Sequence, residues 1–176
     1  MDAGLNPNVD SVASVFISRW DGAVAAKVPD NLKNKLGIAM AQRTYRAARA
    51  LTGSPRWQHI YNAGAHPQRL LWASTGAKDP SVSDIIYVKA LAAPFTVNTM
   101  PEATLIALEK NNELGSIMAA DGGDCEEILK QFADAGIDID SLGVKLQDEG
   151  AKSFVKSWNE LMTVIESKSS KLQKVF

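Results

Sequence analysis

The sequence predicts an α/β fold in which helices connect the strands of a parallel sheet. Three runs of apolar residues are typical of strands: residues 9–17, 69–74 and 95–98. A segment with apolar residues at helical spacing follows each run, and the first two runs end in polar residues. Strands that alternate with helices form parallel sheets, because each helix returns the chain to the start of the next strand.

The first strand is expected within residues 9–17, where apolar residues are almost continuous. This pattern is typical of a strand that is covered on both faces. This strand is expected to end at polar Ser18 and Arg19, and a short helix over residues 21–27 follows. Asp30 stands where a helix N-cap belongs, so one long amphipathic helix is predicted over residues 31–51.

The middle of the chain repeats the strand and helix pattern. A short helix is predicted around Trp57, and the second strand leads into a loop over residues 75–80. Ser81 and Asp84 are three residues apart, as in a capping box, and they predict the start of a helix that Pro94 ends.

Only helices are predicted after the third strand. Thr99 is expected at the N-cap of a helix that reaches about Lys110. Asp124, with an acidic residue three positions later, forms an acidic variant of the capping box, and Gly136 ends the helix that follows. Beyond it an apolar face has helical spacing: Leu142, Leu146, Phe154, Trp158, Leu161, Met162 and Ile165. Residues 168–176 are expected to form a basic frayed end.

Composition narrows the function classes. The 176 residues include 19 Lys and Arg against 20 Asp and Glu, which gives a net charge of −1. This charge argues against nucleic-acid binding, because affinity for phosphate comes from surplus positive charge.

The single cysteine, Cys125, makes no internal disulfide, so a reduced, cytoplasmic setting is expected. No signal-peptide pattern and no run near ~18 apolar residues is present, so a soluble protein without a membrane partner is expected.

The candidate binding residues lie just after two strands. Ligands of parallel α/β sheets meet the carboxyl ends of the strands. Arg19 follows the first strand, and Ser74 with Lys78 follows the second. A hydroxyl and two cations at neighbouring strand ends predict a site for a phosphate group. A competing interpretation stays open, in which the two cations are solvated loop charges and the serine fills a small core position.

No metal or cofactor site is expected. His59 and His66 have no cysteine or carboxylate at metal-ligand spacing and are interpreted as surface or turn residues. Cys125 lies on the apolar face of a predicted helix and is interpreted as a core residue. The glycines match neither the dinucleotide-binding pattern nor the Walker pattern.

Three blocks of sequence carry a family resemblance: Ser-Val-Ala-Ser-Val-Phe-Ile-Ser-Arg at 11–19, Gln-Arg-Leu-Leu-Trp-Ala-Ser-Thr-Gly-Ala-Lys-Asp-Pro at 68–80 and Asn-Thr-Met-Pro-Glu-Ala-Thr-Leu at 98–105. In order and spacing they resemble consecutive blocks of transaldolase, in the bacterial branch that is also found fused to glucose-6-phosphate isomerase. The Trp-Ala-Ser-Thr-Gly part is the most specific.

The resemblance implies the C-terminal part of an eight-stranded (β/α)8 TIM barrel of the class I aldolase type. Residues 1–113 are then strands six to eight with their helices, and residues 114–176 are a helical segment that packs on the barrel. A complete barrel normally takes roughly 200 to 400 residues. Transaldolases move a dihydroxyacetone unit from fructose 6-phosphate or sedoheptulose 7-phosphate to an aldose phosphate through a lysine Schiff base, in the non-oxidative pentose phosphate pathway. The lysine strand is implied to be missing, so the chain alone is expected to be inactive.

The resemblance also implies roles for residues of the substrate-phosphate end. Three of them match the family's Ser, Phe and Arg at the sixth strand: Ser14, Phe16 and Arg19. In that pattern the Phe lines the substrate and the Arg grips its phosphate. Ser74 matches a seventh-strand Ser that helps hold the phosphate. Many transaldolases place an Arg two residues further on, where this chain has Gly76, and Lys78 is the candidate that supplies the charge instead.

The expected partners are a sugar phosphate and either the missing N-terminal half of the barrel or further copies of this chain. An incomplete barrel leaves sheet edges and an apolar interior open, which favours association. The alternative function is a non-catalytic phosphate-binding or assembly module that folds as a half barrel. A small flavodoxin-like protein fits poorly, because only three strands are predicted.

Overall fold

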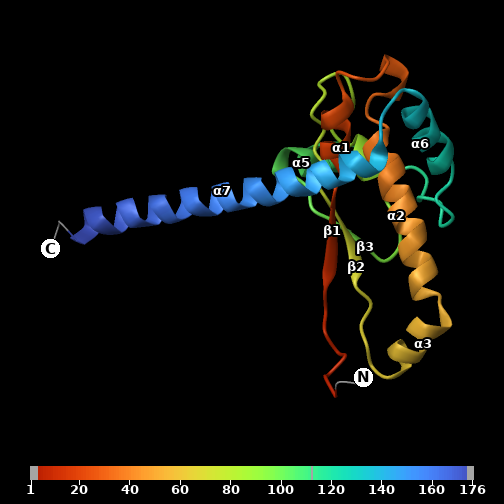
Figure 1. The fold of residues 1–176 in the computed structure, drawn as a ribbon, viewed down its shortest axis with the longest axis horizontal. Coiled ribbons are helices and arrows are strands. Elements are labelled where there is room, and N and C mark those ends of the chain that lie inside the picture. Colours follow the sequence, from red (N-terminus) through yellow and green to blue (C-terminus); the bar gives the residue numbers. More distant parts are fainter. Residues whose placement is uncertain (1–3, 112, 174–176) are drawn as a thin grey trace. The chain divides into compact units, whose positions relative to one another are not determined.

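The computed structural model describes residues 4–111 and 113–173. The chain forms two compact units, Met1–Ile137 and Asp138–Phe176. The first unit holds the sheet and helices α1 to α6, and the second holds the long helix α7 (Figure 1). The domain boundary at residues 113 and 114 that the resemblance implies stays a prediction.

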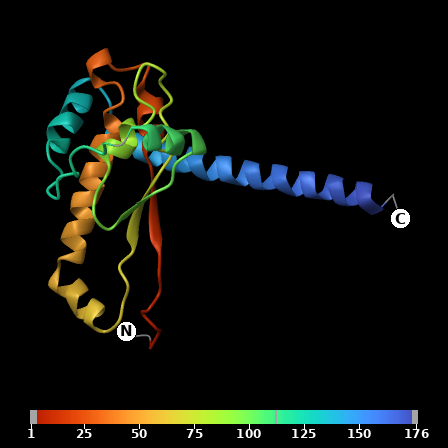
Figure 2. The ribbon, with the colours of Figure 1, turned by 180° about the vertical axis from the view of Figure 1, so that it is seen from behind.

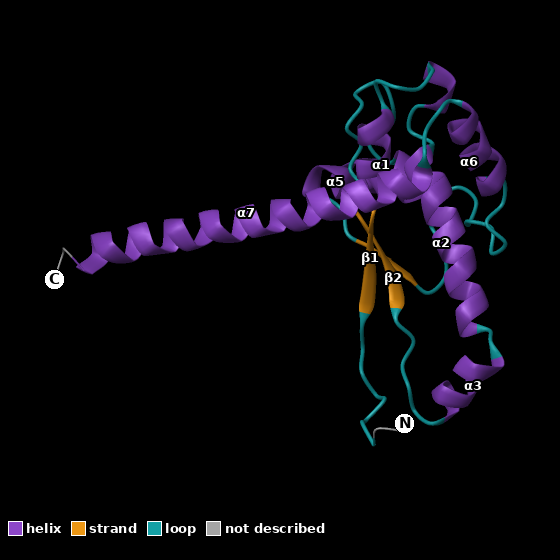
Figure 3. Ribbon diagram, in the orientation of Figure 1, coloured by secondary structure: helices purple, strands orange, loops and turns teal. Residues whose placement is uncertain are grey.

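The sheet of the described chain has three parallel strands in the order β1-β2-β3, which confirms the predicted number and direction of the strands. They are β1 (Val12–Phe16), β2 (Arg69–Ala73) and β3 (Thr96–Asn98), drawn in orange in Figure 3. Phe16 pairs with Ala73, and Trp72 pairs with Asn98. The three strands therefore end at the same edge of the sheet.

The core lies on one face of the sheet. Leu70 and Trp72 of β2 belong to a buried apolar cluster, and Ala13 and Val15 of β1 pack against it. Trp72 is fully buried, and its indole Nε1 donates to the carbonyl oxygen of Leu91 at 3.1 Å. The rest of the cluster comes from the helices and from the connecting segments: Ile17, Ala41, Tyr45, Tyr87, Leu91 and Met118.

The other face of the sheet carries residues from the alternate positions of the strands, because side chains alternate along a strand. Ser14 pairs with Leu71, and Leu71 pairs with Val97. Phe16 lies two residues beyond Ser14 on the same face. The substrate-binding candidates of β1 therefore face away from the helix-packed core.

The first strand is shorter than predicted. β1 ends at Phe16, and α1 (Ile17–Val24) begins at the next residue, ahead of the predicted helix start. Ser18 and Arg19 were predicted to end the strand, and they lie instead in the first turn of α1. The backbone N–H of Ser18 donates to the carbonyl oxygen of Ser74 at 3.1 Å, which anchors this turn to the end of β2.

The long helix begins later than predicted. A 3-10 turn forms at Asp30–Leu32, and Asp30 pairs with the Nζ of Lys33 at 2.7 Å instead of capping the helix. The helix α2 spans Leu36–Thr52. Its first N–H groups donate to the carboxylate of Asp21 in α1, at 2.9 Å from the Leu36 nitrogen. The cap therefore comes from 15 residues upstream, outside the local sequence pattern.

The predicted short helix around Trp57 is confirmed as α3 (Pro55–Asn62). Ser54 caps it, since its Oγ accepts from the Trp57 N–H at 3.2 Å.

The helix cap predicted at Ser81 is wrong, because the Ser81 hydroxyl donates to Asp79 at 2.6 Å. The helix there, α4 (Ile86–Ala90), starts later and is short.

The cap predicted at Thr99 is also wrong. The helix α5 (Glu102–Lys110) starts after Pro101, and no side chain caps it. The Thr99 N–H donates to the carbonyl oxygen of Trp72 at 2.9 Å. The Thr99 hydroxyl donates to the same oxygen at 3.4 Å, so both polar groups of this residue bond to β2 and its side chain does not cap α5.

Helix α6 (Cys125–Asp134) lies beside α2 (Figures 1 and 2). Arg43 and Arg46 of α2 both bind the carboxylate of Glu126, with 2.5 Å between Arg46 Nη2 and Oε1. Asp124 takes the predicted N-cap position, but its side chain makes no capping hydrogen bond. Cys125 is fully buried, which confirms its interpretation as a core residue.

Helix α7 (Ile139–Gln173) confirms the helix predicted for the end of the chain. The segment predicted to fray continues this helix from residue 168 to residue 173, and residues 174–176 lie outside the described residues. Within residues 4–111 and 113–173, no helix combines the length and the apolar character that crossing a membrane requires.

Candidate functional site

The carboxyl ends of β1 and β2 bring the candidate residues to one edge of the sheet. Phe16 is opposite Ala73 in the parallel register, so the residues that follow the two strands are neighbours. Ser74 leaves β2 at this edge, and the first turn of α1, which carries Arg19, leaves β1 there. The structure places these residues at the edge that the strand ends predict.

Ser74 is held in place by Ser18. The Ser18 N–H donates to the Ser74 carbonyl oxygen at 3.1 Å, and the two Oγ atoms are 2.8 Å apart. Ser74 has a φ of 56°, in the left-handed region that residues with a Cβ rarely adopt. Ser18 is 2% exposed, whereas Ser74 is half-buried. Sequence reasoning missed Ser18, because its contact crosses from one strand end to another.

Thr75 joins the end of β2 to the end of β3. Its fully buried side chain donates through Oγ1 to Asn98 Oδ1 at 2.8 Å and lies equally close to the Thr99 carbonyl oxygen. Sequence reasoning missed this residue too, although it follows the strand directly. Together the hydrogen bonds of Ser18 and Thr75 connect the ends of the three strands.

Arg19 packs on Phe16. The guanidinium carbon lies 4.3 Å from the centroid of the Phe16 ring, and both side chains are half-buried. A guanidinium over an aromatic face is attracted by the ring electrons and keeps its hydrogen-bond donors for another ligand. The structure therefore brings together the cation and the aromatic ring that were predicted to face the substrate.

Ser14 and Lys78 are both exposed, and the structure does not join them to the other candidates by hydrogen bonds. No hydrogen bond or ion pair joins either residue to the rest of the described chain. The loop of Lys78 is nevertheless fixed by its neighbour. Asp79 accepts from Asn34 Nδ2 at 3.0 Å and from Ser81, and these hydrogen bonds lower the pKa of Asp79 to about 2.

Gly76 stands where a second phosphate-binding arginine was expected from the resemblance. A Cβ at this position would lie 3.2 Å from the Cγ of Pro101, closer than an ordinary van der Waals contact, and 3.6 Å from the Oγ1 of Thr104. A side chain at residue 76 therefore needs the ring of Pro101, just before α5, to move by a few tenths of an ångström. The packing of α5 on this loop explains how a glycine suits the position.

A buried carboxylate fixes α1 beneath the candidate site. Asp21 accepts from the N–H groups of Leu36 and Gly37 and from the Tyr87 hydroxyl, which lies 2.8 Å from Oδ2. Burial raises the pKa of Asp21, and the hydrogen bonds from Tyr87 and the backbone oppose this rise. At Gly37 a Cβ would lie 2.5 Å from the Ile17 carbonyl oxygen, so α1 and α2 are in direct backbone contact.

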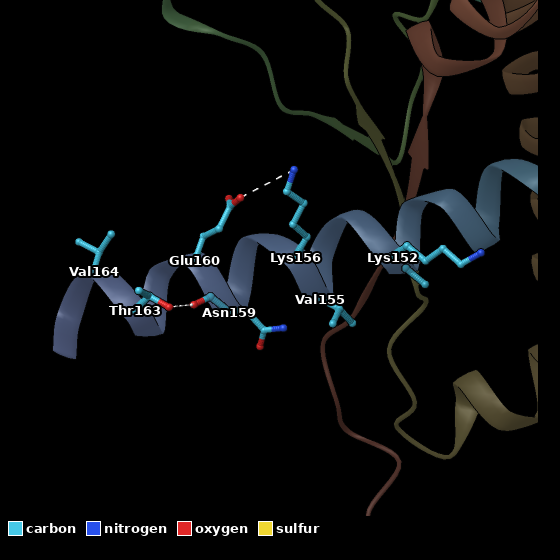
Figure 4. A pocket seen from close by; sticks show the side chains of 8 residues that line it. Lys152, Val155, Lys156, Asn159, Glu160, Thr163 and Val164 are labelled. Atoms are coloured by element: carbon cyan, nitrogen blue, oxygen red, sulfur yellow. Dashed lines mark hydrogen bonds and ion pairs between the residues drawn. The ribbon is translucent and has the colours of Figure 1, made fainter. Parts of the chain in front are cut away.

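Two concave surfaces of the described chain lie away from the strand ends. A cavity of about 260 Å³ is lined by residues of α2 and α3 and by the start of β2, including Trp57 and Arg69. A second surface runs along α7 (Figure 4), where Lys156 pairs with Glu160 at 3.8 Å. This surface belongs to one helix and has no opposite wall. Neither surface contains a residue of the candidate site.

The titratable side chains elsewhere do not form a metal site in the described ranges. His66 is partly exposed, and its Nδ1 lies 2.8 Å from Asp10 Oδ1. Cys125 is buried on α6. The chemistry that the strand-end residues support is anion binding, through one guanidinium and several hydroxyl groups.

Comparison with known proteins gives consistent matches. A profile of the family "Transaldolase/Fructose-6-phosphate aldolase" matches residues 1–165. The chain is 39% identical over 166 residues to a transaldolase of Parafrankia sp., with 90% of this chain and 45% of that protein covered. It is 41% identical over 162 residues to a transaldolase of Mycolicibacterium smegmatis, covering 88% and 44%. "Transaldolase 2" of Streptomyces coelicolor is 38% identical over 172 residues, covering 93% and 46%. The chain spans about half the length of these relatives.

Proposed function

Because the chain belongs to the transaldolase/fructose-6-phosphate aldolase family, we propose that it forms the substrate-phosphate end of a transaldolase active site. Three residues bind the phosphate in this proposal, and a fourth adds charge: Ser14, Arg19, Ser74 and Lys78. Phe16 lines the substrate. The sugar phosphate lies across the carboxyl ends of β1 and β2.

The shared edge of β1 and β2 is the observation that carries the proposal. Arg19 and Ser74 follow strands that pair in register, and Ser18 joins the two strand ends through two hydrogen bonds. A phosphate is bound by several hydrogen-bond donors that converge on its oxygens, and a guanidinium can supply two of them. At this edge the guanidinium of Arg19 and the hydroxyl of Ser74 come from two different segments of the chain. Ser18, next to Arg19, and Ser74 are 56 residues apart in the sequence.

Each residue has a distinct task in phosphate binding. Arg19 offers two parallel N–H donors to two phosphate oxygens, and Phe16 supports the plane of its guanidinium. Ser74 and Ser14 donate single hydroxyl protons. Lys78 acts as a point charge on a loop that Asp79 holds in place. It supplies the positive charge that an arginine at position 76 provides in many transaldolases, since residue 76 is a glycine here.

The proposal assigns β1, β2 and β3 to strands six, seven and eight of an eight-stranded barrel. The resemblance of the three sequence blocks favours strands six to eight. The parallel order of the strands, their helical connections and the 44–46% coverage of the relatives support a part of a barrel. The strand face with Ser14 and Phe16 is then the inner face of the barrel. The rest of the barrel, or further copies of this chain, is the partner that completes the sheet, and the setting is the cytoplasm.

The chain contributes binding in this proposal, and the reacting groups come from elsewhere in the barrel. None of the described strands contains a lysine. The complete enzyme would transfer dihydroxyacetone between sugar phosphates through a lysine Schiff base, in the pentose phosphate pathway. The alternative, a non-catalytic phosphate-binding or assembly module, uses the same residues without any transfer, and its open sheet edges favour association.

Calorimetric binding of fructose 6-phosphate tests the proposal, on the protein expressed from its complete reading frame. We expect Arg19→Ala to weaken binding by about 1.5–3 kcal/mol, the cost of a lost charged hydrogen bond. Arg56→Ala is the matched control, because Arg56 is an exposed arginine of α3, outside the candidate site. Equal affinities for native protein and Arg19→Ala would remove Arg19 from the site.

A further inference from the structure

We infer that Ser18 is a positioning residue that directs the hydroxyl proton of Ser74 toward the substrate phosphate. The inference rests on the proposed function of Ser74 as a phosphate ligand. It adds a buried residue that does not touch the substrate itself, since only 2% of Ser18 is exposed.

The direction of the hydrogen bond between the two serines follows from the chemistry of the ligand. The Oγ atoms are 2.8 Å apart, and either one has the geometry to donate. A serine hydroxyl has one proton, and phosphate oxygens act as acceptors. When Ser74 donates its proton to phosphate, its oxygen is left to accept from Ser18. The bound state therefore has Ser18 donating to Ser74, and Ser74 donating to the phosphate.

The surroundings of Ser18 favour this direction. Within the described residues, the Ser18 hydroxyl has no hydrogen-bond partner other than Ser74. A buried hydroxyl that does not donate leaves its proton unsatisfied, which costs free energy. Ser18 therefore donates to Ser74 before the ligand arrives. Successive hydrogen bonds in one direction also polarise each other, so the Ser74 proton becomes a stronger donor.

Backbone geometry adds a second constraint. The Ser18 N–H holds the Ser74 carbonyl oxygen at 3.1 Å, and Ser74 has a φ of 56°. In this left-handed conformation the Cα–Cβ bond of Ser74 points in a different direction from that of a residue in extended backbone. Ser18 thus fixes both the backbone and the hydroxyl of Ser74, and its hydroxyl can be removed without touching the backbone contact.

A double-mutant cycle on the protein expressed from its complete reading frame tests this role. The dissociation constants of inorganic phosphate and fructose 6-phosphate are measured for native protein, Ser18→Ala, Ser74→Ala and the double variant. We expect Ser74→Ala to weaken the binding of both ligands about three- to tenfold and Ser18→Ala about two- to fivefold. In the Ser74→Ala background, Ser18→Ala should have no further effect, because the oxygen that it orients is absent.

Three controls separate positioning from general loss of stability. Ser54→Ala removes the N-cap of α3, far along the chain from this edge, and should lower the melting temperature without changing phosphate affinity. Ser18→Cys keeps a side chain of similar size with a weak donor, and it should weaken phosphate binding in the same direction if Ser18→Ala does not fold. Fructose, which lacks the phosphate, should bind native protein and Ser18→Ala equally.

The outcomes are distinguishable. An unchanged phosphate affinity in Ser74→Ala overturns the proposed function of Ser74 and, with it, this inference. A clear loss in Ser74→Ala with native affinity in Ser18→Ala and Ser18→Cys overturns the inference alone. Independent, multiplicative losses in the double variant also overturn it, because Ser18 would then act on the ligand without Ser74.

Discussion

At Ser74 the backbone and the hydroxyl have different requirements. The positive φ favours glycine, since a Cβ in the left-handed region costs roughly 1–2 kcal/mol. The proposed phosphate contact requires the hydroxyl. A residue that keeps a strained conformation where a ligand is expected is typical of functional sites.

Ser74→Gly separates the two requirements. We expect this variant to be about 1 kcal/mol more stable than Ser74→Ala, because glycine adopts the left-handed conformation without a Cβ penalty. Both variants should lose phosphate affinity to the same extent. Urea unfolding and phosphate calorimetry measure the two effects, and native affinity in Ser74→Gly would show that the hydroxyl is not a ligand.

Whether a site residue could be predicted from the sequence depended on how far away in the chain its contact partners lie. Arg19 and Ser74 were predictable, because residues that follow neighbouring parallel strands meet at one edge. Ser18 and Thr75 were not, because their partners lie 56 and 23 residues away and depend on the register of the sheet. The binding roles given to all five site residues stay predictions: Ser14, Phe16, Arg19, Ser74 and Lys78.

Helices α2 and α6 are joined by charge as well as by packing. The carboxylate of Glu126 accepts hydrogen bonds from Arg43 and Arg46, and these bonds lower the pKa of Glu126 to about 2. The ordinary value is 4.5. A carboxylate with a depressed pKa in the folded state stabilises the fold above its unfolded pKa, and this stabilisation disappears as the pH falls toward the folded pKa.

Glu126→Gln should therefore flatten the acid dependence of stability. Between pH 4.5 and pH 2 we expect the urea midpoint of the native protein to fall more steeply than that of the variant. Glu109→Gln is the control, since Glu109 is an exposed carboxylate of α5. Parallel pH profiles for native protein and Glu126→Gln would mean that the two arginines do not stabilise the folded state through this carboxylate.

The order of the elements was predictable, whereas several of their ends were not. Apolar spacing is a local property, so it identified the strands and the long helices. The start of α2 depends on Asp21, which caps it from a different helix. Thr99 and Ser81 have the sequence of caps, but the sheet and Asp79 use their hydrogen-bonding groups. Tertiary contacts therefore decided the helix ends.

On the scale of the whole molecule, the sheet has two outer strands. Within the described residues, β1 and β3 each pair with β2 alone. In a closed barrel every strand has two neighbours, so the proposed strands six and eight each need one more. This arrangement matches the proposal that the reacting lysine belongs to another part of the barrel.

Borohydride reduction in the presence of fructose 6-phosphate tests whether the reacting lysine lies outside this chain. We expect no covalent labelling of the 176-residue chain, because no lysine lies in a described strand where burial could give a nucleophilic amine. The transaldolase of Mycolicibacterium smegmatis is a positive control for trapping. Mass-spectrometric detection of a reduced sugar adduct on this chain alone would contradict the expectation.

Gly37 shows that a position closed to substitution need not be one that meets a ligand. The gap between α1 and α2 has no room for even a methyl group at this residue. A larger side chain would push α1 outward and carry Arg19 with it. A variant could thus keep every residue expected to hold the sugar phosphate and still present its arginine in the wrong place. Redesign of the candidate site should therefore leave residue 37 untouched and begin at the loop of Lys78.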